Sequence, residues 1–147
     1  IGTAGMIGGQ VMDIEHEGKP ISAGELNILH SMKTGALIRA SARMGCVVAG
    51  APDDVIARAD KYAKNIGIAF QITDDILDVT STEEKLGKPV ESDRQMGKTT
   101  YATLYGVEKS RQIVKDLVLE ADLSIKGSVL DDPFLYRLAD QLAQRDC

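Results

Sequence analysis

Aromatic residues are scarce in this 147-residue sequence, at 4% of the chain, and tryptophan is absent. Strands are enriched in aromatic and β-branched residues, whereas the apolar positions here recur at intervals of three and four, which is typical of helices. No apolar run approaches the roughly 20 residues that cross a bilayer, and no charged-then-apolar secretory leader opens the sequence. We therefore expect an all-α protein without membrane insertion.

Cysteine is nearly absent as well. Cys46 lies in an apolar helical stretch and Cys147 is the last residue, so the two do not form the pattern of a disulfide framework, and a reducing cytoplasm fits. The net charge of −5 and the pI near 5.0 argue against a nucleic-acid surface. An acidic protein still binds anions where metal ions and a few lysines reverse the local field.

Glycine and proline divide the helical pattern into segments. Ser22 and Glu25 form a capping-box signature that opens the second helix, and Asp132-Pro133 opens the last one. Between Thr80 and Gly97 the periodicity is lost, which predicts a long functional or mobile loop. The expected helices cover about residues 2–15, 22–47, 53–79, 100–105, 107–125 and 133–142.

Three carboxylates end the third helix, in the string Phe70-Gln71-Ile72-Thr73-Asp74-Asp75-Ile76-Leu77-Asp78. At roughly 100° per residue, Asp74 and Asp78 come within about 40° of each other, with Asp75 a step around the helix. Helix capping does not explain them, because the macrodipole disfavours anions at a C-terminal end. Hard cations such as Mg²⁺ take oxygen ligands of this kind. The alternative is a solvated acidic face.

This string resembles the second aspartate-rich motif of the trans-prenyl diphosphate synthases, the farnesyl and geranylgeranyl diphosphate synthase family. Further landmarks follow in the family order: Gly9-Gln10-x-x-Asp13, Lys33-Thr34-Gly35-Ala36-Leu37, Gly87-Lys88, and Asp93 followed by Lys98-Thr99. The similarity is greatest to the bacterial-type farnesyl diphosphate synthases. It implies that residues 1–147 form the C-terminal part of the isoprenoid synthase helical bundle, the C-terminal half of a single all-α domain whose N-terminal half is absent.

The resemblance implies an activity. An allylic diphosphate would ionise, condense with isopentenyl diphosphate and lose a proton, with Mg²⁺ or Mn²⁺ as cofactor. The product would be a short-chain prenyl diphosphate, farnesyl diphosphate foremost, although the side chains that set its length lie outside this chain. The resemblance also implies a homodimer. This piece alone is expected to be inactive, since the family carries a first aspartate-rich motif and a basic isopentenyl diphosphate site in its N-terminal half.

Roles for single residues follow from the same resemblance. Asp74 would bind Mg²⁺ directly, while Asp75 and Asp78 would hold metal-bound waters. Lys33, Lys88 and Lys98 match the lysines that contact the allylic diphosphate. Asp13 would pair with Lys33, and Gln71 would face the cavity. The remaining candidates are Thr34 at the reacting carbons, Gln10 beside the substrate, Phe70 as core or cavity wall near the prenyl chain, and Asp93 near the outer metal shell.

Other interpretations stay open. Any one of the lysines, taken alone, is more often a solvated surface residue, and Gln10, Asp13 or Gln71 could be a satisfied buried polar group. A class I terpene cyclase shares the metal logic, but its motif usually contains Asn and Ser or Thr with Glu. A non-catalytic helical subunit that docks on an active synthase is a further alternative. His16, His30 and Cys46 receive no role, and the tail at residues 145–147 lacks the basic cluster of some family members.

Overall fold

The computed structural model describes residues 2–81 and 97–144, and within these ranges every regular element is a helix. The elements are α1 (Met6–Glu15), α2 (Ala23–His30), a π-helical turn η1 (Ser31–Gly35), α3 (Ala36–Val48), α4 (Asp53–Thr80), α7 (Tyr101–Tyr105), α8 (Val107–Ile125) and α9 (Pro133–Ala143). The predicted all-α class is confirmed. Within the described ranges, no helix is both long and apolar enough to span a bilayer.

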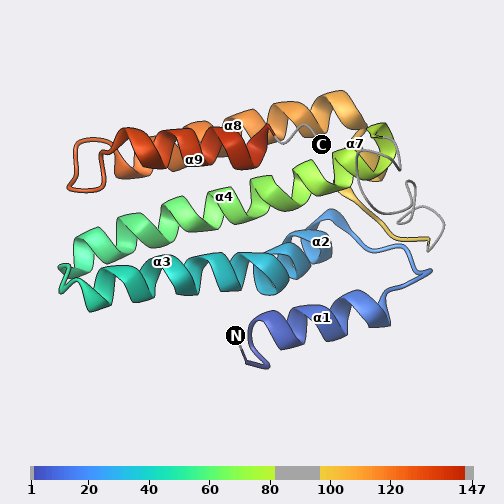
Figure 1. Cartoon of the computed structure of the whole chain (residues 1–147). Helices are drawn as coiled ribbons and strands as arrows, with labels where there is room; N and C mark the ends of the chain where they lie inside the picture. The colour runs from blue at the N-terminus through green and yellow to red at the C-terminus, as the bar shows by residue number, and fades with distance from the viewer. Residues whose placement is uncertain (1, 82–96, 145–147) are drawn as a thin grey trace.

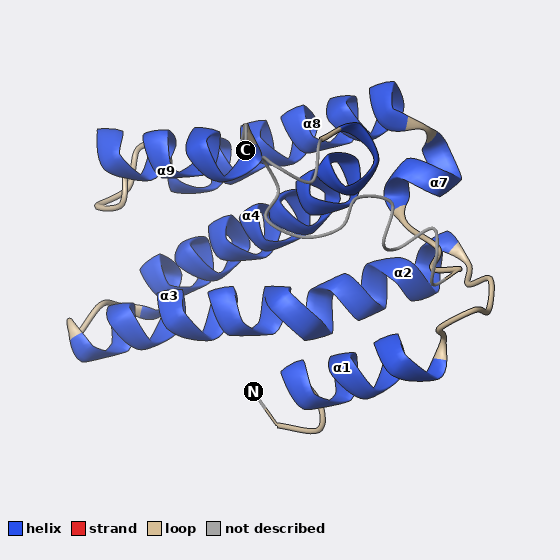
Figure 2. Cartoon of the chain, turned by 45° about the vertical axis from the view of Figure 1, so that its right-hand side comes forward, coloured by secondary structure: helices blue, strands red, loops and turns tan. Residues whose placement is uncertain are grey.

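The long helix α4 runs through the middle of the molecule (Figure 1). Helices α8 and α9 lie along one side of α4, and the continuous α2–η1–α3 segment lies along the other, with α1 outermost (Figure 2). Buried side chains of α4 enter two apolar clusters, one around Ile72 and Ile76 and one around Ile66. Each such buried side chain stabilises the fold by about 1.5 to 3 kcal/mol. The acidic end of α4 is therefore anchored in the core.

Most helix boundaries follow the sequence signals. The hydroxyl of Ser22 accepts from the amide of Glu25, and the Glu25 carboxylate accepts from the Ser22 amide, which completes the predicted capping box. Asp132 caps α9 ahead of its proline. Gly106 takes a φ of 78° between α7 and α8, a conformation that favours glycine. The predicted break at this glycine is thus confirmed.

Two local expectations need correction. The first helix begins at Met6 rather than Gly2, because residues 3–5 form a turn and Gly5 offers no capping side chain. The segment predicted as one helix over residues 22–47 contains the π-helical turn Ser31–Gly35. Such turns lie within α-helices and give no apolar period of their own, so the pattern of residues did not predict it.

Some expectations fall outside the described residues. They concern Gly87, Lys88 and Asp93, most of the predicted loop between Thr80 and Gly97, and the tail at residues 145–147.

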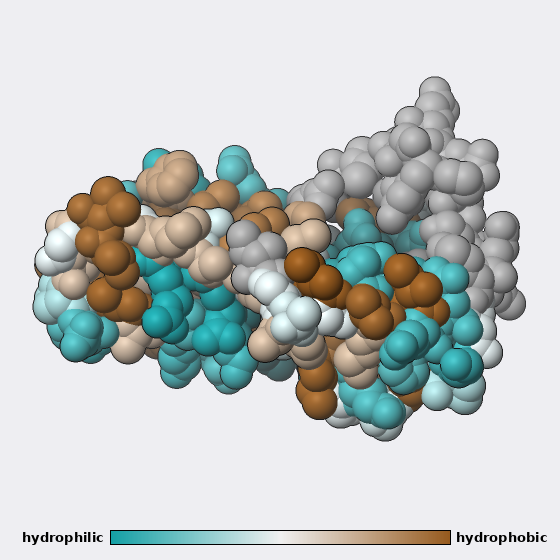
Figure 3. All heavy atoms as spheres, turned by 90° about the horizontal axis from the view of Figure 1, so that it is seen from below, coloured by the Kyte–Doolittle hydropathy of each residue, from teal (hydrophilic) through white to brown (hydrophobic). Residues whose placement is uncertain are grey.

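Helices α1 and α3 carry exposed apolar side chains. On α1 they include Ile7, Val11 and Ile14, and on α3 they include Met44 and Val48. Viewed from below, the molecule shows apolar patches that are separated by hydrophilic residues (Figure 3).

Candidate functional site

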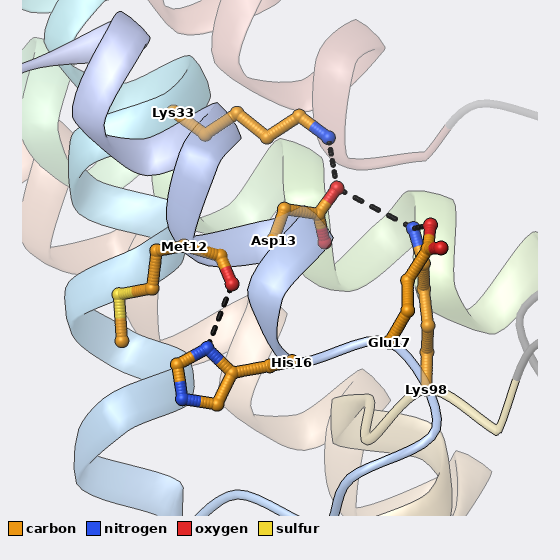
Figure 4. Close-up of polar contacts among 6 residues, drawn as sticks. All are labelled: Met12, Asp13, His16, Glu17, Lys33 and Lys98. Carbon is orange, nitrogen blue, oxygen red and sulfur yellow. Dashed lines mark hydrogen bonds and ion pairs between the residues drawn. The ribbon is translucent and has the colours of Figure 1, made fainter.

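Two lysines share one carboxylate where α1 ends. Lys33 Nζ lies 2.7 Å from Asp13 Oδ2, and Lys98 Nζ lies 3.3 Å from the same oxygen (Figure 4). Glu17 adds a weaker contact, with its Oε1 3.7 Å from Lys98 Nζ. The predicted pairing of Asp13 with Lys33 is therefore confirmed, and Lys98 joins it from a segment 85 residues further along the chain.

The three charged groups come from separate elements. Asp13 lies in the last turn of α1, Lys33 on the π-helical turn, and Lys98 in the segment that leads into α7. That segment is held against the end of α1 by a close approach of two glycines. A Cβ on Gly97 would lie 3.1 Å from the Cα of Gly18, and both glycines have positive φ. The close approach brings Lys98 to Asp13.

Burial and charge compete at Asp13. Burial raises the pKa of its carboxyl, but the hydrogen bond from Lys33 and the charges of Lys33 and Lys98 outweigh that effect, so the pKa lies below its ordinary value. The side chains of Lys33 and Lys98 are 33% and 19% exposed. The carboxylate is thus ionised at neutral pH, yet its single charge is accompanied by two ammonium groups. The two ammonium groups of the cluster are partly exposed, so they can also bind an anion in the pocket.

A pocket lies beside this cluster and is lined by residues from several elements. Gln71, Asp74 and Asp75 line it from α4, Lys33 lines it from the π-helical turn, and Lys98 lines it from the segment before α7. Gln71 and Asp74 thus line the pocket, and the roles expected for them stay predictions. The full lining is Asp13, His16, Lys19, Ile21, Leu26, Leu29, His30, Lys33, Gln71, Asp74, Asp75, Lys98, Thr99 and Thr100.

The three aspartates of the motif differ in their surroundings. Asp74 is partly exposed, Asp75 is 8% exposed and Asp78 is 1% exposed. Asp75 accepts a hydrogen bond of 2.9 Å from the amide of Tyr101, which ties α4 to α7. Asp78 is not among the residues that line the pocket. Over residues 2–81 and 97–144, no group of three or more Asp, Glu, His or Cys residues is arranged to hold a metal ion.

His30 also lines the pocket, although no role was predicted for it. Its ring is 4% exposed and stacks on Tyr101, with the ring centroids 5.6 Å apart. Burial lowers the pKa of His30 to about 4; the charge of Asp13 opposes this shift and that of Lys33 adds to it. The imidazole is therefore neutral at pH 7. The sequence held no signal for this placement, since a lone histidine in an apolar helix has no distinctive pattern.

The other predicted residues lie further from the pocket. Gln10 on α1, Thr34 on the π-helical turn and Phe70 on α4 are partly buried, but they do not line this pocket. Lys88 and Asp93 lie outside the described residues. Of the candidates, the structure brings together Asp13, Lys33, Gln71, Asp74, Asp75 and Lys98.

Comparisons with known proteins agree with this arrangement. The family model described as "Polyprenyl synthetase" matches residues 2–127. Farnesyl diphosphate synthase of Escherichia coli (strain K12) is 45% identical over 152 residues, which cover 99% of this chain and 50% of that protein. Geranylgeranyl diphosphate synthase of Cyanophora paradoxa is 48% identical over 120 residues, covering 81% of this chain and 40% of that protein.

Solved structures are similar too. The geranyltransferase from Helicobacter pylori, complexed with magnesium and isoprenyl diphosphate, superimposes with a TM-score of 0.77 at 32% identity. The match covers 94% of this chain and 45% of that one. The chain spans about half the length of the curated relatives named above, or somewhat less.

Proposed function

Since this chain belongs to the polyprenyl synthetase family, we propose that the whole protein that contains it transfers a prenyl group from an allylic diphosphate to isopentenyl diphosphate. The observation that carries the proposal is one pocket lined by Lys33 and Lys98 together with Asp74. A diphosphate that binds together with a divalent cation needs positively charged side chains for its oxygens and carboxylates for the metal. The relatives' names and their identity to this chain support the reaction class.

Negative charge develops on the diphosphate as it departs. The bond between the allylic carbon and the diphosphate oxygen breaks, and both electrons leave with the oxygen. The double bond of isopentenyl diphosphate then attacks the allylic cation, and a proton is lost. In this proposal the ammonium groups of Lys33 and Lys98 bind the diphosphate oxygens and stabilise the charge that develops there. Asp13 keeps both ammonium groups aimed at the pocket before the substrate arrives.

The acidic wall fits a divalent metal in its chemistry. Mg²⁺ usually takes one or two protein carboxylates together with substrate phosphates and waters, so Asp74 and Asp75 on the pocket wall are a sufficient protein contribution. Asp74 would be the direct ligand, and Asp75, held by the Tyr101 amide, would orient metal-bound waters. When bound, the metal neutralises charge on the diphosphate. The Helicobacter pylori relative, which is complexed with magnesium and isoprenyl diphosphate, supports magnesium as the metal.

The remaining predicted residues keep their roles as proposals. Gln71 faces the pocket and would bind a polar substrate atom near the acidic wall. Thr34 follows Lys33 on the π-helical turn, and its small neutral hydroxyl suits the reacting carbons. Gln10 and Phe70 would line the substrate further from the charges. Asp78 is the exception: it was expected to hold metal-bound waters, but it is 1% exposed and does not line the pocket, so it would act on the metal shell only through its neighbours on α4.

The assembly and location of the whole protein are proposals as well. We expect a homodimer in the cytoplasm, with farnesyl diphosphate as the product. The apolar side chains exposed on α1 and α3 support the proposal that other protein surfaces pack against these helices. Because the compared relatives include both a farnesyl and a geranylgeranyl diphosphate synthase, the chain length of the product has to be measured.

The test is an assay of the whole protein with an allylic diphosphate, labelled isopentenyl diphosphate and Mg²⁺. We expect labelled prenyl diphosphate, with its formation abolished by a metal chelator and restored by added Mg²⁺. A non-catalytic subunit would give no product alone but would change the output of an active synthase. No product under any of these conditions, from a protein shown to be folded, would contradict the proposal.

A further inference from the structure

The π-helical turn that carries Lys33 has a glycine against it on either side. Gly9 of α1 is buried and faces the middle of the turn at Lys33, and Gly67 of α4 faces its end at Gly35. A Cβ built on Gly9 would lie 2.5 Å from the backbone nitrogen of Lys33 and 2.8 Å from its Cα. These distances are too short for any real Cβ. The backbone of α1 therefore lies so close to the turn that only glycine fits at this position.

The contact on the other side is also close. A Cβ on Gly67 would lie 3.0 Å from the Cα of Gly35, the last residue of the turn. Both close neighbours are backbone atoms, which cannot move aside as the end of a flexible side chain can. Packed interiors transmit such displacements, and enlarging a side chain there forces backbone shifts. A methyl group at either glycine would therefore displace the turn.

The geometry of the charged cluster depends on the same contact. Gly9 and Asp13 lie four residues apart, so they share one face of α1. Gly9 meets the backbone of Lys33, and one turn further along α1 Asp13 meets the ammonium of the same residue at 2.7 Å. The spacing between α1 and the turn therefore sets the length of that ion pair.

We propose that Gly9 and Gly67 are positioning residues that hold the π-helical turn where Lys33 meets Asp13 and reaches the pocket. The glycines touch no substrate in this account. They act through the backbone of the turn, and the consequence for diphosphate binding rests on the function proposed above. Gly9 has the larger part, since its contacts are the shorter and its helix also carries Asp13.

The test compares Gly9→Ala with Gly45→Ala in the whole protein. Gly45 is the matched control because it lies in α3, and a Cβ there would meet nothing within 4 Å. We expect Gly9→Ala to bind inorganic diphosphate with Mg²⁺ about tenfold more weakly than Gly45→Ala, a change equivalent to about 1.4 kcal/mol. In the transfer assay, we expect kcat/KM to fall by roughly 10- to 100-fold, as for other small misplacements of catalytic groups.

A double-mutant cycle separates positioning from a general loss of stability. In the Asp13→Asn background the pairing with Lys33 is already weakened, so we expect Gly9→Ala to cost much less diphosphate affinity there than in the wild type. Equal binding by Gly9→Ala and Gly45→Ala would overturn the proposal. So would the same loss from Gly9→Ala in both backgrounds.

Gly67→Ala decides the matter if Gly9→Ala does not fold, because its contact at 3.0 Å needs a smaller adjustment. A loss of diphosphate affinity relative to Gly45→Ala supports the proposal, and equal affinity contradicts it. Diphosphate binding is measured without prenyl transfer. A wild-type protein that binds diphosphate but transfers no prenyl group would therefore count against the proposed function alone.

Discussion

At the scale of single residues, one carboxylate organises the basic side of the pocket. Asp13 accepts from Lys33 and Lys98 through the same oxygen, although these residues lie far apart in the chain. Two ammonium groups so close together would otherwise repel each other, and the carboxylate between them offsets that repulsion. The basic side of the pocket is thereby set before any ligand binds.

The acidic side gives the first prediction. In the whole protein, Asp74→Ala should lower kcat by several orders of magnitude, because a carboxylate at the pocket stabilises charge that develops as diphosphate departs. Asp78→Ala should cost clearly less, since Asp78 does not line the pocket. Steady-state kinetics check this prediction, with circular dichroism to confirm folding. Equal losses would remove the distinction between the two aspartates, and unchanged kinetics in Asp74→Ala would remove the metal assignment.

His30 gives a prediction about pH. The folded protein holds its pKa at about 4, below the ordinary value of 6.5, so between these pH values the unfolded chain binds the additional proton. The stability that His30 contributes is therefore complete above pH 6.5 and is lost as the pH falls towards 4. Between pH 7 and 4.5 we expect the wild type to lose about 2 kcal/mol more unfolding free energy than His30→Gln.

Urea unfolding of both proteins at the two pH values measures that difference. The contributions of the aspartates largely cancel in the comparison, because both proteins contain them. If wild type and His30→Gln lost the same stability on acidification, His30 would not be held neutral by the fold.

The sequence predicted part of this site. The run of carboxylates around Asp74 was found from the sequence itself, whereas Lys33, Lys98 and the pairing of Asp13 with Lys33 followed from the family resemblance. The second partner of Asp13 could not be predicted, since it depends on the approach of Gly97 to Gly18. His30 was missed because a lone histidine in an apolar helix has no distinctive pattern.

At the scale of elements, capping residues and glycines account for most helix boundaries. Each cap contacts groups only a few residues away, so the sequence alone predicts it. Ser22, Gly106 and Asp132 all lie where a local rule places them. The π-helical turn is different. It is packed between backbones of α1 and α4, which are distant in sequence, so it depends on tertiary contacts that no local pattern reports.

The capping box of α2 gives a prediction at this scale. Ser22→Ala should lower the unfolding free energy by about 1 kcal/mol, because the amide of Glu25 loses its acceptor. Ser41→Ala is the control, since that exposed hydroxyl only donates to the carbonyl of Leu37 one turn back in α3. Urea unfolding of the two variants checks this. Equal unfolding free energies of Ser22→Ala and Ser41→Ala would show that the capping box does not stabilise the protein.

At the scale of the whole molecule, the 147-residue chain supplies one acidic wall and the basic cluster, while its relatives are about twice as long. We predict that the isolated chain transfers no prenyl group, whereas the whole protein does. Catalysis needs the reacting groups held in near-attack geometry, and a single wall does not hold metal and both substrates in that way. Prenyl transfer by the isolated chain would contradict this.

The most direct test of the central claim is a crystal structure of the whole protein with Mg²⁺ and inorganic diphosphate. The account predicts diphosphate oxygens within hydrogen-bond distance of Lys33 Nζ and Lys98 Nζ, with a Mg²⁺ between the diphosphate and the carboxylate of Asp74. Asp13 should still contact both lysines. A diphosphate bound elsewhere, or one bound here with Asp74 far from any metal, would contradict the account.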